Sequence, residues 1–273
     1  MSELNLKEKR LINWFEEQQG VITAFSGGVD SALVLYLARK ILGKEKTIGV
    51  ISKSESLKSK DYEIAVDFAR QFDIELKTIH TNEFADSNYV ANTNLRCYFC
   101  KTHLYDELQI VRTQFPDFTI VNGSNADDKS DYRPGEQAAI EKEIRSPLAE
   151  CDITKGEIRT LAKKYKLPVW NKPASPCLSS RIPYGNEINV GILKQIEQAE
   201  EILNSFGFEE VRVRHYGTSC RIEVLFEKIP LLKKNFHEIS GLINEHAGFQ
   251  YCILDEEGLV SGKLNRVLNV TYE

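Results

Sequence analysis

Apolar residues in the first 120 positions follow two alternating patterns. Leu4, Leu11 and Trp14 recur at the spacing of one helix face, and this spacing predicts an amphipathic helix over 3–18. Short apolar runs alternate with further helical segments, so we expect strands at 21–25, 47–51, 76–80 and 119–121 and helices at 32–42, 58–72 and 101–115. Strands that alternate with helices predict an α/β fold with a doubly wound parallel sheet, covered on both faces.

The pattern changes in the second half of the chain. Thr154 and Glu157 form a capping box that begins a helix. Residues 168–185 contain four of the eight prolines and no clear period, which is typical of an ordered functional loop or a domain boundary. Beyond this loop we expect a helix at 189–205 and strands at 211–215, 220–226 and 249–254. We therefore predict an α/β domain at 1–184 and a small α+β domain at 185–273.

Composition excludes several classes of protein. The 273 residues are 42% hydrophobic and 27% charged, which is ordinary for a globular protein. The net charge of −5 argues against a nucleic-acid partner. No stretch approaches the roughly 18 consecutive apolar residues of a membrane span. The N-terminal residues MSELNLKEKR lack the apolar core of a signal peptide, so we expect a cytoplasmic protein with six reduced cysteines.

A glycine pair follows the first predicted strand and precedes a helix. In the segment SGGVDS, Gly27 and Gly28 let backbone N–H groups turn toward an anion, and the helix N-terminus adds the positive end of its dipole. Ser26 and Ser31 add hydroxyl donors. The lysine of the GxxxxGK[ST] loop is missing, so the pattern predicts a different phosphate-binding turn. The alternative is an ordinary strand-to-helix turn.

Carboxylates follow the fourth predicted strand. Asp127 and Asp128 lie just beyond residues 119–121, and ligands gather at the carboxyl ends of strands in open α/β sheets. Clusters of oxygen ligands suit Mg²⁺ bound beside phosphates. We expect a nucleotide site here; the alternative is a solvated acidic turn.

The cysteines admit several interpretations. Cys97 and Cys100 form a C-x-x-C pair, which is typical of a redox pair, half of a zinc site or two ligands of an iron–sulfur cluster. The sequence has no second C-x-x-C pair for a Cys₄ zinc site. Cys177 lies in a proline-bounded loop near Arg181, where a thiolate would serve as nucleophile or metal ligand. Packing as small apolar residues is the alternative for all three cysteines.

SGGVDS and the later segment GSNADD resemble the PP-loop of the ATP pyrophosphatase (adenine nucleotide α-hydrolase) superfamily. The resemblance implies a HUP-like sheet that binds ATP, transfer of AMP to a substrate oxygen and release of pyrophosphate. It also implies that ATP and Mg²⁺ are held by Ser26, Gly27, Gly28, Asp30, Ser31, Asn125, Asp127 and Asp128.

A second resemblance is more specific. DYRPG at 131–135, CLSSRIPYG at 177–185 and VRVR at 211–214 are similar to LarE-type sulfur transferases, and matching segments cover about 8–265. This family adenylates the carboxylates of pyridinium-3,5-biscarboxylic acid mononucleotide and converts them to thiocarboxylates for the nickel-pincer nucleotide cofactor. The resemblance implies a homo-oligomer. The sequence does not identify the sulfide donor.

The family contains two types. In one, a cysteine matching Cys177 sacrifices its own sulfur; in the other, a C-x-x-C pair and a third cysteine hold a [4Fe–4S] cluster that delivers sulfide. Cys97 and Cys100 place this chain in the cluster type, with Cys177 as the third ligand. The resemblance further implies substrate binding by Arg133, Ser180, Arg181, Arg212 and Arg214, and metal or substrate binding by Glu200 and Glu223.

Two of these arginines lie on one predicted strand. Arg212 and Arg214 alternate on a predicted strand and so share a face, where two guanidinium groups suit a phosphate or carboxylate. A solvated edge strand is their alternative, and exposed surface carboxylates are the alternative for Glu200 and Glu223.

Three other functions compete. A tRNA thiolase of the same superfamily is disfavoured by the negative charge and by the lack of a basic, aromatic-interleaved stretch. An amidotransferase-like synthetase needs a source of ammonia, and no glutaminase domain fits in the remaining length. A non-enzymatic ATP-sensing module would not release pyrophosphate with a carboxylate substrate.

Overall fold

The computed structural model describes residues 2–130, 134–260 and 262–270, which group into two compact units. Unit 1 comprises Met1–Glu83 and Cys97–Ser175, and unit 2 comprises Phe84–Arg96 and Pro176–Glu273. Residues 84–96 and 176–184 thus belong to unit 2, whereas the sequence placed them in the first domain. The reason is a set of hydrogen bonds between these two segments, described below.

Unit 1 is built on a parallel sheet, as predicted. Within the described residues its strand order is β3-β2-β1-β4. The strands are β1 (Val21–Ala24), β2 (Thr47–Ser52), β3 (Glu75–Ile79) and β4 (Thr119–Val121). Ile22 of β1 pairs with Ile48 of β2 on one side and with Ile120 of β4 on the other. The strand order therefore reverses at β1, and its carboxyl end is the point where open α/β sheets bind ligands.

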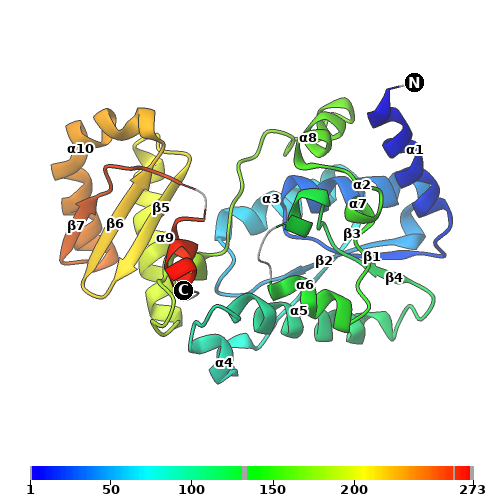
Figure 1. The fold of residues 1–273 in the computed structure, drawn as a ribbon, viewed down its shortest axis with the longest axis horizontal. Coiled ribbons are helices and arrows are strands. Elements are labelled where there is room, and N and C mark those ends of the chain that lie inside the picture. The colour runs from blue at the N-terminus through cyan, green and yellow to red at the C-terminus, as the bar shows by residue number, and fades with distance from the viewer. Residues whose placement is uncertain (1, 131–133, 261, 271–273) are drawn as a thin grey trace. The chain divides into compact units, whose positions relative to one another are not determined.

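Helices cover both faces of this sheet (Figure 1). They are α1 (Glu3–Glu16), α2 (Val29–Leu42), α3 (Ser59–Gln71), α5 (Arg96–Arg112), α6 (Pro134–Glu141), α7 (Pro147–Glu150) and α8 (Lys155–Lys164). Residues of α1, α2, α3, α7 and α8 form one apolar cluster, and residues of α5 and α6 form another. Successive side chains of β1 point to opposite faces of the sheet, so Val21 packs in the first cluster and Ile22 in the second.

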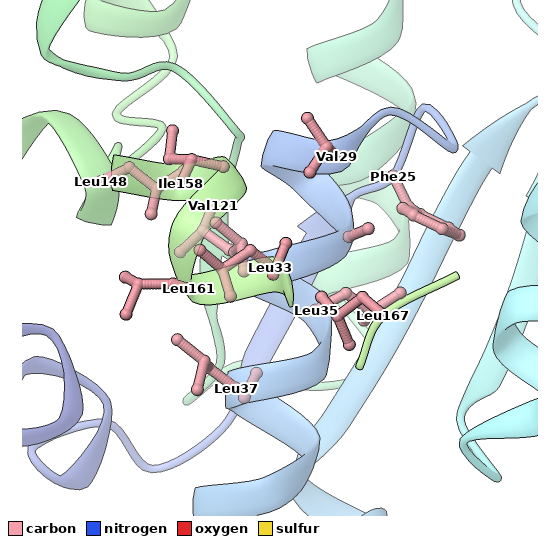
Figure 2. Packing of buried hydrophobic residues seen from close by; sticks show 14 of the residues in the cluster. Phe25, Val29, Leu33, Leu35, Leu37, Val121, Leu148, Ile158, Leu161 and Leu167 are labelled. Carbon is pink, nitrogen blue, oxygen red and sulfur yellow. The ribbon is translucent and has the colours of Figure 1, made fainter. Parts of the chain in front are cut away.

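The helix α2 is central to the first cluster. Leu33, Leu35 and Leu37 are fully buried, as the nearly continuous apolar run of this helix predicts. Figure 2 shows Ile158 and Leu161 of α8 beside Leu33. This packing holds α2 in place, and α2 begins just after the turn at residues 25–28 that follows β1.

Unit 2 contains a small second sheet, which agrees with the predicted α+β region. Its strands are β5 (Val211–Tyr216), β6 (Ser219–Val224) and β7 (Tyr251–Leu254), and its helices are α4 (Ser87–Val90), α9 (Val190–Ser205) and α10 (Ile229–Leu242). β5 and β6 are antiparallel, and β7 pairs with β6 in parallel. No helix in the described parts of the chain is long and apolar enough to span a membrane.

Candidate functional site

The turn between β1 and α2 needs glycine for two reasons. Gly27 has a φ of +70°, in the left-handed region that side chains disfavour. A Cβ atom at Gly27 would also lie 3.0 Å from the carbonyl oxygen of Asp61 and 3.3 Å from the Cβ of Ala65. Bare backbone therefore lines this turn, as a phosphate-binding loop requires.

Two serine hydroxyls close the turn. The backbone N–H of Ser26 donates to Ser31 Oγ at 3.2 Å, and the two hydroxyl oxygens are 3.1 Å apart. Ser31 Oγ also donates to the carbonyl of Gly28 at 3.3 Å. Gly28 is the N-cap of α2 and provides no side-chain hydrogen bond to the helix. The backbone N–H groups of the first turn therefore have no capping side chain and suit an anion.

A second close approach joins the end of β4 to this turn. A Cβ atom at Gly123 would lie only 2.7 Å from the backbone nitrogen of Ser31. Only glycine allows the chain after β4 to pass so near the first turn of α2. The segment predicted to complete the nucleotide site therefore begins beside the glycine turn.

The polar residues after β4 have partners of their own. Asp127 Oδ2 accepts a hydrogen bond from the backbone N–H of Lys155 at 2.8 Å. Asp128 Oδ2 accepts from the N–H of Asn125, and Asn125 Oδ1 accepts from the N–H of Asp127, both at 3.0 Å. These bonds shape the turn and fix it to the start of α8. A nucleotide-binding role for the three residues stays a prediction, and Arg133 lies outside the described residues.

Asp30 fits a magnesium ligand. Its Oδ2 forms an ion pair with Lys155 Nζ, while its Oδ1 is buried with no hydrogen-bond partner among the described residues. A buried carboxylate oxygen without a partner is costly. A cation bound beside phosphates at this turn would satisfy it.

Lys172 is a candidate that the sequence motifs did not reveal. Its Nζ donates to the carbonyl of Gly27 at 2.9 Å and pairs with Asp61 Oδ1 at 2.9 Å. Ser175 Oγ donates to the other oxygen of Asp61 at 2.6 Å. The proline-rich loop thus brings a cation to the glycine turn from 145 residues away. The only sequence signal was the prediction that 168–185 is an ordered functional loop.

In unit 2, Arg181 organises the loop that carries Cys177. Its guanidinium bonds both oxygens of Glu200, at 2.8 and 3.2 Å, and both side chains are almost fully buried. The same guanidinium donates to the carbonyl of Pro176 at 2.8 Å and to Ser180 Oγ at 2.9 Å. Arg181 therefore sets the backbone course on both sides of Cys177.

The remaining predicted arginines lie on β5. Arg214 donates to the carbonyl of Ser180 at 2.7 Å and pairs with Glu223 at 2.8 Å, in the interior. Arg212 donates to the carbonyl of Val260 at 3.3 Å. Burial, followed by the charges of Arg214 and Arg181, lowers the pKa of Arg212. No carboxylate among the described residues forms an ion pair with Arg212, although the charges of Glu223 and Glu200 lie near enough to offset its own in part.

These contacts assemble six predicted residues into one polar cluster of unit 2: Ser180, Arg181, Glu200, Arg212, Arg214 and Glu223. Glu200 pairs with Arg181, and Glu223 pairs with Arg214. Within either unit, the described residues contain no group of three His, Cys, Asp or Glu side chains placed to hold a metal ion. Metal binding by Glu200 and Glu223 stays a prediction.

The cysteines separate by exposure. Cys97 and Cys177 are exposed and Cys100 is half-buried, whereas Cys151 is buried. Packing as a small apolar residue therefore describes Cys151 but not Cys97 or Cys177. Cys97 and Cys100 lie one turn apart at the start of α5, in unit 1, and Cys177 belongs to unit 2.

Residues 84–96 support the Cys177 loop and were not singled out by sequence. Asn92 Nδ2 donates to the carbonyls of Pro183 and Asn186, each at 2.9 Å. Arg96 donates to Asn92 Oδ1 at 2.8 Å and to the carbonyl of Ser179 at 2.9 Å. These bonds explain why this segment belongs to unit 2.

The chain is similar over nearly its full length to known proteins. A family model described as NAD synthase matches residues 9–95, which include the glycine turn. An uncharacterised protein of Synechocystis is 42% identical over 97% of this chain and 99% of its own length. The pyridinium-3,5-bisthiocarboxylic acid mononucleotide synthase of Lactiplantibacillus plantarum is 32% identical over 98% of this chain and 97% of its own. The chain belongs to this synthase family.

Membership in the synthase family confirms the LarE-type resemblance drawn from the sequence. The NH₃-dependent NAD⁺ synthetase of Pyrococcus horikoshii is 40% identical, but over only 32% of this chain and 34% of its own length. The similarity to the synthase therefore covers both units at 32% identity, whereas the NAD⁺ synthetase of Methanocaldococcus jannaschii is only 26% identical over 80% of this chain.

Proposed function

We propose that this protein is an ATP-dependent sulfur transferase. It adenylates a carboxylate of pyridinium-3,5-biscarboxylic acid mononucleotide and converts it to a thiocarboxylate, in the synthesis of the nickel-pincer nucleotide cofactor. The observation that carries the proposal is the similarity to the synthase over 98% of the chain, together with a glycine turn at the carboxyl end of β1.

In the proposed reaction, unit 1 handles ATP. The first turn of α2 and the hydroxyls of Ser26 and Ser31 bind the pyrophosphate portion. Asp30 provides an oxygen for Mg²⁺, and Lys172 adds positive charge beside Gly27. These groups stabilise pyrophosphate as it leaves, while AMP is joined to the substrate carboxylate.

Unit 2 binds the substrate in this proposal. The three arginines of the polar cluster outnumber its two glutamates, and Arg212 forms no ion pair with a described carboxylate, so it suits the phosphate or a carboxylate of the mononucleotide. Arg181 and Arg214 both donate hydrogen bonds to Ser180, so these three residues shape the site.

We further propose that the protein is a homo-oligomer; its sulfide donor is unidentified.

For sulfur delivery we propose that Cys97, Cys100 and Cys177 hold a [4Fe–4S] cluster. The cysteines on α5 fit two ligands, because their thiols lie one helical turn apart and neither is fully buried. Such a cluster, when bound, supplies sulfide at an iron that carries no protein ligand. The exposed thiol of Cys177 is equally compatible with sacrificial donation, which is the competing mechanism.

The test combines pyrophosphate release with product mass. Anaerobically purified protein is incubated with ATP, Mg²⁺ and the biscarboxylic mononucleotide, and we expect substrate-dependent pyrophosphate and exchange of oxygen for sulfur. Arg212→Met should lower the yield of sulfur product while ATP binding persists; Arg221→Met, on the exposed part of β6, is the matched control. Pyrophosphate release that depends instead on tRNA, or on ammonia and a dinucleotide, would overturn the proposal.

A further inference from the structure

Two cysteines of unit 2 face each other across neighbouring strands. Cys220 of β6 and Cys252 of β7 are register partners in the parallel pair, and their sulfur atoms are 3.7 Å apart. Cys220 is fully buried in the unit 2 core, and Cys252 packs against that core while remaining partly exposed. Neither residue has a role in the proposed sulfur transfer.

We propose that Cys220 and Cys252 are a redox-active thiol pair, which hydroperoxides convert to a reversible disulfide. This site goes beyond the proposed function, and its test does not depend on sulfur-transfer activity.

The backbone already meets the geometric requirement for a disulfide. Neighbouring strands lie about 4.8 Å apart, within the Cα separation of roughly 4.4–6.8 Å that a disulfide spans. The two sulfur atoms touch at 3.7 Å, so a change in side-chain rotamer brings them to the bonding distance of about 2.05 Å. No rearrangement of β6 or β7 is needed.

The surroundings of Cys252 make it the attacking thiol. The S–H of Cys220 donates to Cys252 Sγ, which lowers the pKa of Cys252 and raises that of Cys220. The side-chain amide of Asn244 is oriented with its nitrogen 2.9 Å from the carbonyl oxygens of Ser240 and Phe249. The same nitrogen lies 3.5 Å from Cys252 Sγ. Both N–H groups of this amide are used by the two carbonyls, so the S–H bond from Cys220 and the partial exposure of Cys252 are what favour attack by Cys252.

The chemistry balances in two steps. Cys252 thiolate attacks one oxygen of the hydroperoxide, the O–O bond breaks, and Cys252 sulfenic acid forms as water or an alcohol leaves after protonation. The thiol of Cys220 then attacks Cys252 Sγ, the S–O bond breaks and a second water leaves. Two thiols lose two electrons and two protons, and the peroxide is reduced by two electrons.

Peptide mapping of the wild-type chain tests the proposal directly. Reduced protein is titrated with hydrogen peroxide until the exposed Cys97 begins to oxidise, the remaining thiols are alkylated, and tryptic peptides are weighed. We expect residues 215–221 linked to residues 235–263, and the link should disappear with dithiothreitol. Recovery of these two peptides only in separately alkylated form, while the 97–101 peptide is oxidised, would overturn the proposal.

Single variants test the assigned roles. In Cys220→Ser, peroxide should leave a sulfenic acid on Cys252 that dimedone traps; in Cys252→Ser, Cys220 should stay untrapped because it is buried. Cys151→Ser should form the link as wild type does, since Cys151 lies in unit 1. Equal trapping of Cys220 and Cys252 would contradict the order of attack.

Discussion

Arg181 and Glu200 show how single residues hold charge inside unit 2. Glu200 Oε1 also accepts the backbone N–H of Val213 at 3.1 Å, so the pair joins the Cys177 loop to α9 and β5. Burying two charges carries a large desolvation penalty, which their mutual attraction and additional hydrogen bonds offset. Removing one member takes away the opposite charge that the other contacts in the interior.

We therefore expect Arg181→Met to lower the free energy of unfolding by about 3–5 kcal/mol. Urea denaturation followed by far-UV circular dichroism measures the loss. Arg221→Met is the control. The Arg221 side chain is 45% exposed and lies 3.8 Å from Asp255, so this variant should lower the free energy of unfolding by less than about 1 kcal/mol. Equal losses in the two variants would contradict the argument.

A second residue links the stability of unit 2 to pH. His215 is buried, its ring lies 5.5 Å from that of Phe249, and its Nδ1 accepts the backbone N–H of Gly217 at 3.3 Å. Burial lowers the pKa of His215 below its ordinary value of 6.5. Below about pH 6.5 the unfolded chain therefore binds a proton that the folded chain excludes. The free energy of unfolding decreases as the pH is lowered, by at most about 1.4 kcal/mol per pH unit.

The measurement compares urea unfolding at about pH 7.5 and about pH 5.5, a range that brackets this titration. His215→Gln should show a smaller decrease in unfolding free energy over this range than wild type. His237→Gln, at an exposed position of α10, should behave as wild type. A decrease in His215→Gln as large as that of wild type would show that other groups cause the acid sensitivity.

At the scale of elements, Lys172 fastens the proline-rich loop to the glycine turn. If Lys172 also donates to a phosphate of bound ATP, that charge-assisted hydrogen bond contributes about 1.5–3 kcal/mol. Removal of the ammonium group should then weaken ATP binding by roughly 10- to 150-fold. We expect this change in the dissociation constant of Lys172→Met, measured by titration calorimetry. Lys163→Met, on the exposed side of α8, is the control. Unchanged ATP affinity in Lys172→Met would exclude a role for this lysine at the phosphates.

Elements whose signals are local were predictable from sequence. The capping box of Thr154 and Glu157 forms as expected at the start of α8, and β1, β2 and β4 lie within a residue of their predicted bounds. The helix α6 was missed, because its short apolar pattern gives no clear period. The position of Lys172 and the bonds of Asn92 and Arg96 were also missed, because they depend on partners far away in sequence that no local pattern encodes.

At the scale of the whole molecule, the two units are not consecutive pieces of chain. The backbone passes between them at 83/84, 96/97 and 175/176. A fragment ending at residue 184 would retain Asn92, Arg96 and Arg181 but lose Glu200 and β5. Arg181 would then be left without its carboxylate, so the predicted boundary at 184/185 does not mark a fragment that keeps its buried contacts.

The proposed cluster tests the function at this same scale, because its three cysteines come from positions 97, 100 and 177 of the chain. Anaerobic reconstitution with iron and sulfide should give about four iron atoms per chain, with the absorbance and paramagnetic resonance of a [4Fe–4S] cluster. Cys97→Ala, Cys100→Ala and Cys177→Ala should each lose this signal, whereas the buried Cys151→Ala should retain it. If wild type binds no iron and its Cys177 loses a sulfur atom during turnover, the sacrificial mechanism is correct.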